Sequence, residues 1–322
     1  MNPPLLVATR GWDAETWAKR LRAELPGREI LATGRDGLFA GADAALAGVH
    51  YVLVWKPPQT TLDRLPALRV IFSLGAGVDH IFALPRLPNV PVARIVDPDL
   101  TQRMTEHVVW QCLDHLRLGA TYRRQQRAHQ WRDVEPPAAR EVTVGIMGLG
   151  VMGNDAAAAL TRLGFNVRGW ARTRRTIPGV DCFAGAAELD AFLGGTDILV
   201  SLLPLTPETR HLVDLALLKK LRRGDPLGGP IFINAGRGGT HVEAAIVTAL
   251  RDGTLAGASL DVFEEEPLSP ESPLWDFDNV AITPHVAAVS DPVALARQIS
   301  RQIAAFERGE ALSNCVDPER GY

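Results

Sequence analysis

The segment that most constrains the fold of this chain is VTVGIMGLGVMGNDAAAALTRLG, residues 142–164. It places Gly148, Gly150 and Gly153 in the spacing GxGxxG, between an apolar run typical of a buried strand and an alanine-rich run typical of a helix. Glycines let the backbone approach a pyrophosphate, whose charge meets the amide groups at the start of the helix. A tight turn without a ligand is the alternative, but the flanking strand and helix favour a dinucleotide-binding βαβ unit.

Three arginines follow the next predicted strand, where such units usually carry an acidic residue that binds the ribose 2′-hydroxyl. Between Ala156 and Val180 the chain has no Asp or Glu, but it has Arg172, Arg174 and Arg175. A carboxylate there repels a 2′-phosphate, whereas a guanidinium binds it in a charge-assisted pair. The arginines therefore favour NADP(H), with NAD(H) as the second choice. Arg172 is the first expected ligand, the assisting arginine is left open, and a solvated cationic loop is the alternative.

Strand and helix patterns alternate over most of the chain, which predicts parallel sheets with crossover helices. The expected strands lie at 5–9, 51–55, 68–74, 91–96, 142–148, 165–170, 198–204, 231–236, 257–263 and 280–285. A length of 322 residues is sufficient for two domains. Helical periodicity without a proline from Thr101 to Trp131 predicts one long helix between the two halves.

Composition excludes several classes of protein. The formal net charge of −3 provides no general attraction to nucleic acid or to an anionic membrane, so neither is an expected partner. The cysteines Cys112, Cys182 and Cys315 form no CxxC pair, which argues against a disulfide framework and against a metal site. The N-terminal segment has no basic region, and its apolar run is too short for a signal peptide or a membrane span, so we expect a cytoplasmic protein.

Three later segments place ionisable residues next to predicted strand ends: NAGRGG (234–239), LDVFEEEPL (260–268) and TPHVAA (283–288). Ligands of parallel α/β sheets lie outside the carboxyl ends of the strands, so these positions are candidates for a site. Each has an ordinary structural alternative. The arginine could cap a helix or form an ion pair, the acid could belong to an exposed run, and the histidine could be hydrogen-bonded in the core.

The order GxGxxG, NxxRG, DVFxxEP and TPH resembles the D-isomer-specific 2-hydroxyacid dehydrogenases. The resemblance extends to GAGVDHI and MTEHVV, and WARTRRTIPGV and EPLSPESPLW are similar to the glyoxylate/hydroxypyruvate reductase A branch. It implies an α/β fold of two Rossmann-like or flavodoxin-like domains with parallel sheets and an interdomain cleft. The substrate-binding domain would comprise residues 1–100 and 287–322, and the NADP-binding Rossmann domain residues 101–286.

The resemblance also assigns catalytic roles to three residues. Arg237 would bind the substrate carboxylate and polarise the ketone oxygen. His285 would protonate that oxygen while hydride arrives from the nicotinamide, and Glu266 would pair with the histidine. These roles are chemically consistent, because a nearby carboxylate favours the protonated imidazole and a planar guanidinium matches a carboxylate.

Further binding residues follow from the resemblance. The expected cofactor-binding residues are Gly148, Gly150, Val151, Met152, Gly153, Arg172, Thr173, Arg174, Leu203, Pro204, Thr206, Ala235 and Asp261. The expected substrate-binding residues are Trp55, Ala76 and Gly77, together with Arg237 and His285. One departure from the pattern follows the arginine, where Thr240 and His241 replace residues that are often apolar in relatives. His241 is a competing catalytic histidine, but its place at an expected helix start favours a solvated or capping role.

The activity implied is NADPH-dependent reduction of small 2-oxo acids, glyoxylate to glycolate and hydroxypyruvate to D-glycerate, by a homodimer. One alternative is a dinucleotide-sensing, corepressor-like binding protein on the same fold, since a sensor can retain catalytic residues. Another is a methyltransferase, which would leave the arginines and the TPH motif unexplained. The sequence leaves open which 2-oxo acid is physiological, the direction in vivo and the strength of the cofactor preference.

Overall fold

The computed structural model describes residues 2–224 and 226–318 and divides into two compact units. Unit 1 comprises Met1–Leu100 and Ser290–Tyr322, and unit 2 comprises Thr101–Val289. The expected substrate-binding domain has the same first segment as unit 1, residues 1–100. Its second segment was expected to begin at residue 287, whereas the second segment of unit 1 begins at Ser290. Its expected ends at Met1 and at 319–322 lie outside the described residues.

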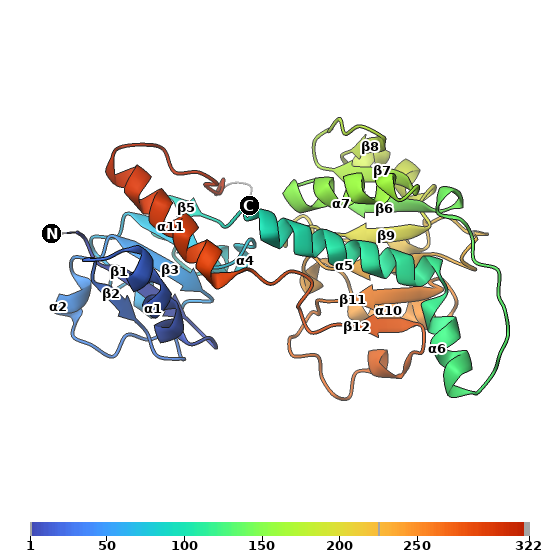
Figure 1. The fold of residues 1–322 in the computed structure, drawn as a ribbon, viewed down its shortest axis with the longest axis horizontal. Coiled ribbons are helices and arrows are strands. Elements are labelled where there is room, and N and C mark those ends of the chain that lie inside the picture. Colours follow the sequence, from blue (N-terminus) through green and yellow to red (C-terminus); the bar gives the residue numbers. More distant parts are fainter. Residues whose placement is uncertain (1, 225, 319–322) are drawn as a thin grey trace. The chain divides into compact units, whose positions relative to one another are not determined.

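Unit 1 is built around a five-stranded parallel sheet (Figure 1). In spatial order its strands are β2 (Ile30–Ala32), β1 (Leu5–Thr9), β3 (Tyr51–Trp55), β4 (Val70–Ser73) and β5 (Val92–Ala93). β1 is buried at every residue, as expected for a central strand covered on both faces. Alternate side chains therefore enter two different cores, with Leu5 and Val7 in one and Leu6 and Ala8 in the other.

The helices of unit 1 cover the two faces of this sheet. α1 (Ala14–Glu24) and α11 (Pro292–Glu307) contribute to one core, and α2 (Asp43–Leu46), α3 (Gln59–Leu62) and α4 (Asp79–Phe82) to the other. The start of α11 is specified locally, because Asp291 accepts a hydrogen bond from Val293 N at 2.9 Å and a proline occupies the first turn. α11 belongs to unit 1, although it lies near the C-terminal end of the chain.

Unit 2 contains a seven-stranded parallel sheet (Figure 1). In spatial order its strands are β12 (Val280–Ile282), β11 (Gly257–Leu260), β10 (Ile231–Asn234), β9 (Ile198–Ser201), β6 (Thr143–Met147), β7 (Asn166–Ala171) and β8 (Val180–Ala184). The chain first builds outward from β6 to β8 and then crosses to β9 on the other side of β6. The strand order therefore reverses between β6 and β9, which is where open α/β sheets bind ligands.

Helices cover both faces of the second sheet as well. The core on one face includes residues of α5 (Pro98–Leu116) and α7 (Val151–Arg162). The core on the other face includes residues of α8 (Leu189–Leu193), α9 (Leu215–Leu218) and α10 (Glu243–Arg251). Two parallel sheets with flanking helices confirm the predicted α/β class.

The prediction of one long helix from Thr101 to Trp131 is wrong. α5 ends at Leu116, and α6 (Gly119–Arg127) begins after Leu118, which adopts a left-handed conformation with φ of 56°. Arg123 donates two hydrogen bonds to the Asp114 carboxylate, at 2.7 and 2.9 Å, and thereby ties α6 back to the end of α5. Gly119, a poor helix former, lies at the break, but the apolar periodicity continues across it and therefore does not reveal it.

Two strands are not marked by the sequence patterns above. β2 has only three residues, and β8 has the sequence VDCFA with partly exposed side chains. Both lie at sheet edges, where burial and therefore apolar patterning are weakest. In the part of the chain that the structure describes, no helix is long and apolar enough to cross a membrane.

Candidate active site

The glycine-rich loop connects β6 to α7 at the point where the strand order reverses. Gly148 has φ of 103°, and a Cβ there would lie 2.8 Å from the carbonyl oxygen of Leu202, so a larger residue would push the neighbouring strand end away. Gly150 precedes the first turn of α7, whose Val151 is exposed and Met152 half-buried. The loop therefore presents the N-terminus of a 12-residue helix at the carboxyl edge of the sheet.

The predicted phosphate-binding arginines follow β7, and one of them, Arg174, has defined contacts within the protein. Arg172, Thr173, Arg174 and Arg175 are all exposed. The Arg174 guanidinium donates to Cys182 O at 2.9 Å and forms an ion pair with Glu188. Glu188 in turn accepts a hydrogen bond from Ala184 N at 2.7 Å. Arg174 thus ties the segment after β7 to the end of β8, which sequence spacing did not indicate.

The next two strands bring four further predicted residues to the same edge of the sheet. Leu203, Pro204 and Thr206 follow β9, and Ala235 follows β10. Thr206 is 8% exposed, and its backbone N donates to Thr209 Oγ1 at 2.8 Å, which holds the loop in a compact turn. Leu203 and Ala235 are buried, so their side chains belong to the core.

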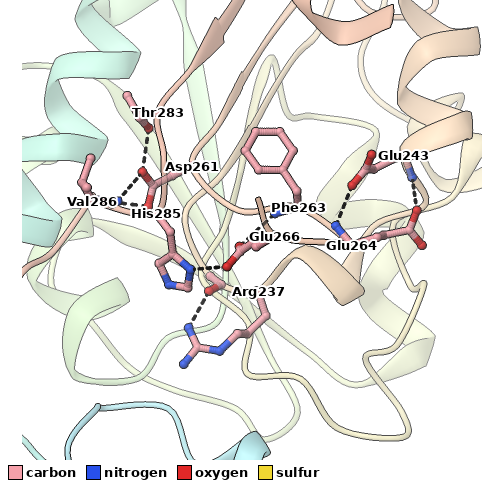
Figure 2. Close-up of polar contacts among 11 residues, drawn as sticks. Arg237, Glu243, Asp261, Phe263, Glu264, Glu266, Thr283, His285 and Val286 are labelled. Atoms are coloured by element: carbon pink, nitrogen blue, oxygen red, sulfur yellow. Dashed lines mark hydrogen bonds and ion pairs between the residues drawn. The ribbon is translucent and has the colours of Figure 1, made fainter. Parts of the chain in front are cut away.

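Arg237, Glu266 and His285 come from the three loops that follow β10, β11 and β12, and their side chains gather at one place (Figure 2). His285 Nδ1 lies 2.8 Å from Glu266 Oε2, with the histidine side chain 41% exposed and the glutamate 29%. Glu266 Oε1 accepts a hydrogen bond from Phe263 N at 3.2 Å. Arg237 Nη1 donates to Gly236 O at 2.8 Å. A carboxylate–imidazole pair and a guanidinium are therefore both within reach of solvent at this edge.

The backbone of His285 is held in a left-handed conformation, with φ of 54°, and Asp261 stabilises it (Figure 2). The backbone N of His285 donates to Asp261 O at 2.8 Å. The Asp261 carboxylate accepts hydrogen bonds from Thr283 Oγ1 at 2.6 Å, Val286 N at 2.9 Å and Ala287 N at 3.0 Å. It is only 1% exposed. The predicted cofactor residue Asp261 therefore also fixes the turn that carries the histidine.

The comparisons with known proteins agree with this arrangement. The sequence profile of the D-isomer specific 2-hydroxyacid dehydrogenase NAD-binding domain matches residues 109–287. The chain belongs to the D-isomer specific 2-hydroxyacid dehydrogenase family.

Solved structures of other members are similar over the whole chain. The NADPH-dependent glyoxylate/hydroxypyruvate reductase of Sinorhizobium meliloti, crystallised with NADP and sulfate, is 51% identical with a TM-score of 0.94, covering 100% of both chains. A probable 2-hydroxyacid dehydrogenase of Rhizobium etli CFN 42, in complex with NADP, HEPES and L(+)-tartaric acid, is 51% identical over 100% of both chains with a TM-score of 0.93. A dehydrogenase of this family from Xanthobacter autotrophicus Py2, with NADPH and MES, is 44% identical over 100% of both chains with a TM-score of 0.92. The chain thus resembles the glyoxylate/hydroxypyruvate reductase A branch of this dehydrogenase family.

The substrate-binding residues predicted in unit 1 lie close together at the ends of β3 and β4. Trp55 stacks on Trp12 at 4.6 Å between ring centroids and contacts the ring of His80 at 4.8 Å. Ala76 and Gly77 lie in the loop after β4, where Ser73 Oγ donates to Gly77 O at 3.3 Å. Lys56 Nζ lies 5.9 Å from the Trp55 ring centroid. Trp55, Ala76 and Gly77 are half-buried, whereas Trp12 and Lys56 are exposed.

Sequence patterns missed a group of buried polar residues behind Arg237. His241 is 0% exposed, so the expectation of a solvated role is wrong. Its Nδ1 lies 2.8 Å from Asn234 Nδ2, within a buried cluster that also contains Thr240. The signal was present in the asparagine of the NxxRG motif, a polar residue at the end of an otherwise apolar strand. No group of three or more metal-ligating side chains occurs in residues 2–224 and 226–318.

Proposed function

We propose that this dehydrogenase reduces small 2-oxo acids, glyoxylate and hydroxypyruvate first, with NADPH as the hydride donor. The observation that carries the proposal is the pair His285–Glu266 at 2.8 Å, gathered with Arg237 at the edge of the sheet (Figure 2). The order of motifs and the NADP-bound or NADPH-bound relatives support the choice of reaction and cofactor.

The residues of unit 2 fit a phosphate-bearing dinucleotide. A Cβ on Gly150 would meet nothing within 4 Å, so the loop before α7 has open space on the side that a pyrophosphate would approach. Arg172 and Thr173 follow β7, in the position for a 2′-phosphate, and Arg174 holds that segment in place. Asp261 and the segment 203–206 border the nicotinamide end in this assignment. Bound NADPH supplies the hydride.

Each catalytic side chain then has one task. Arg237 binds the substrate carboxylate and polarises the ketone oxygen, because its guanidinium is planar and permanently charged. His285 donates its proton to that oxygen as the hydride reaches the carbon. Since Nδ1 of His285 faces Glu266, Nε2 is the ring nitrogen that remains to serve the substrate. Glu266 fixes the orientation of the ring and stabilises its protonated form. Trp55, Ala76 and Gly77 remain predicted substrate contacts.

The test is the initial rate of NADPH and of NADH oxidation with glyoxylate and with hydroxypyruvate, with Arg237→Ala as the control. We expect turnover with NADPH well above that with NADH, and loss of turnover in the variant. Equal rates with the two cofactors would agree with the proposed reductase activity but would contradict the role of the arginines after β7. Tight NADPH binding without turnover of either acid would reject the proposed substrates and favour the dinucleotide sensor.

The homodimer and the cytoplasmic location stay predictions. Sedimentation equilibrium of the purified protein tests the first, and a mass near twice 34.9 kDa is the expected result. Cell fractionation with an antibody against the chain tests the second.

A further inference from the structure

Behind Arg237, the side chains of Asn234, Thr240 and His241 form a cluster in which each residue is 0% exposed. Asn234 is the last residue of β10, Thr240 ends the short helix η3 (Gly238–Thr240), and His241 follows it. None of the three reaches the solvent-facing side of the site. The cluster is nevertheless polar at every member, which is unusual for a position between a strand and the helix that covers it.

The hydrogen bonds of Asn234 determine which atoms of the cluster are donors and which are acceptors. Its Oδ1 accepts from Gly236 N at 3.0 Å, so Nδ2 is the atom on the other side. Nδ2 lies 3.1 Å from Arg237 O, 3.3 Å from Thr240 Oγ1 and 2.8 Å from His241 Nδ1. The amide nitrogen is only a donor, so a protonated Nδ1 could not face it at 2.8 Å. His241 Nδ1 must therefore be unprotonated, and its proton resides on Nε2.

The Arg237 backbone is fixed from both sides by these contacts. Its carbonyl oxygen accepts hydrogen bonds from Asn234 Nδ2 and from Thr240 Oγ1, the latter at 2.6 Å. On the other side, a Cβ at Gly238 would overlap the carbonyl oxygen of Phe263, so the chain lies directly against the β11 loop. That loop continues to Glu266 through the bond from Phe263 N. The position from which the guanidinium extends is thus set by its buried neighbours.

A histidine at position 241 destabilises the folded state. Its ring packs edge-on against Phe232, and Nε2 has no hydrogen-bond partner among the described residues. Burial lowers the pKa of His241 to about 4, so the ring is neutral near pH 7. A buried donor without a partner destabilises a fold, and an apolar side chain of similar size would avoid that cost. An apolar residue, however, would not provide the hydrogen-bond acceptor that His241 Nδ1 offers to Asn234.

We propose that His241 is a positioning residue for the reaction, acting through the Asn234 amide to fix the backbone of Arg237. By accepting one amide hydrogen, the imidazole acts together with Gly236 N to hold Asn234 in the orientation that directs its other hydrogen toward Arg237 O. Without that acceptor the amide is held on one side only, and the Arg237 carbonyl, which Thr240 still binds, is less tightly fixed. Because binding a 2-oxo acid depends on the exact direction of the guanidinium, a small displacement weakens catalysis. This inference rests on the role of Arg237 given under the proposed function.

The test compares two substitutions that differ in one atom type. His241→Asn places an oxygen near the position of Nδ1 and keeps an acceptor, whereas His241→Leu fills the space without one. In His241→Leu we expect kcat/KM for the 2-oxo acid to fall about 30-fold, with the KM for NADPH unchanged. In His241→Asn we expect a loss of less than about fivefold.

The matched control is His115→Leu, which removes a half-buried histidine whose pKa is also lowered. His115 bonds to Ser259 Oγ at 2.9 Å, outside the cluster. The His115→Leu variant should have a lower thermal stability but an unchanged KM for the 2-oxo acid. Equal losses of activity in His241→Leu and His241→Asn, or unchanged kinetics in His241→Leu, would overturn the proposal, because either result denies a role to the acceptor.

A second readout does not depend on turnover. The imidazole ¹⁵N resonances of His241 should show the Nε2–H tautomer in the wild type. The Nε–H resonance of Arg237 should broaden or shift in His241→Leu and remain near its original position in His241→Asn. If the wild type turns over neither acid but these resonances behave as expected, the proposed substrates are wrong while the positioning role stands. An Arg237 resonance that is identical in all three proteins overturns the positioning role.

Discussion

His285 Nδ1 and Glu266 Oε2 lie 2.8 Å apart, on loops that follow two neighbouring strands of one parallel sheet. The contact joins a segment after β12 to a segment after β11, nineteen residues apart in the chain. Glu266 is itself oriented by Phe263 N, so the carboxylate cannot rotate freely away from the ring. The pair combines a defined orientation with access to solvent, which suits a group that must exchange a proton in every turnover.

Glu266→Gln tests the electrostatic part of this pair. The amide retains the shape of the side chain but removes the negative charge that favours a protonated imidazole. We expect kcat for reduction to fall by about 10- to 100-fold. The measurement is kcat with NADPH and hydroxypyruvate in the variant and in the wild type. An unchanged kcat in Glu266→Gln would contradict a role for the charge of the carboxylate.

Arg172 and Arg174 should differ in their effects on cofactor choice. Arg172→Ala should lower the preference for NADPH over NADH by about tenfold or more, since a charge-assisted contact to the 2′-phosphate is lost. Arg174→Ala instead removes the contacts with Glu188 and Cys182, so it should weaken the binding of NADPH and of NADH to a similar degree. The measurement is kcat/KM for the two cofactors in each variant. A selective loss of NADPH in Arg174→Ala alone would reverse the assignment.

The protein should lose stability as the pH falls from about 6.5 to about 4. Burial lowers the pKa of His115 and of His241 from 6.5 to about 4, so the folded state holds both rings neutral. His115 faces Asp114 and Arg123, and His241 faces Glu264 and His211. In the unfolded chain both histidines bind protons below pH 6.5, whereas in the folded protein they stay neutral down to about pH 4. The free energy of unfolding is therefore at its full value above pH 6.5 and falls below it, by roughly 3 kcal/mol for each histidine at most.

The check is thermal denaturation at several pH values in this window. His115→Gln and His241→Asn should each show a smaller drop in Tm between pH 7 and pH 4.5 than the wild type, although they start from a lower value. Carboxylates also contribute to acid destabilisation, and the comparison with the wild type removes their effect. Parallel pH curves for all three proteins would contradict the assignment to these histidines.

Glu307→Gln should destabilise unit 1. Arg28 has a side chain only 3% exposed, and its Nη2 lies 2.7 and 2.9 Å from the two Glu307 oxygens. Glu307 also accepts from Tyr51 OH at 3.1 Å, and burial raises the pKa of Tyr51 to about 12. Removing the charge leaves a buried guanidinium poorly paired, at about 2 kcal/mol. Differential scanning calorimetry should show a lower Tm, with Tyr51→Phe as a milder control. Equal Tm values for Glu307→Gln and the wild type would contradict this role.

The α/β class, most strands and the glycine loop could be predicted from short stretches of sequence. This is because buried parallel strands require continuous apolar runs, and the turn from β6 to α7 requires small residues at fixed spacing. The sequence also placed Arg237, Glu266 and His285 after neighbouring strands, since parallel strands bring their carboxyl ends to one edge. Their roles came from family resemblance and not from these patterns.

Other features depend on specific side-chain contacts that periodicity does not encode. The pair Asp114–Arg123 joins the two helices across the break at Leu118, and the restraint on Arg174 depends on Glu188. The burial of His241 is likewise a property of the packed sheet and helix. Periodicity specified most of the buried strands and the glycine loop, whereas helix ends, edge strands and the state of an individual polar side chain depend on the neighbours that folding brings to them.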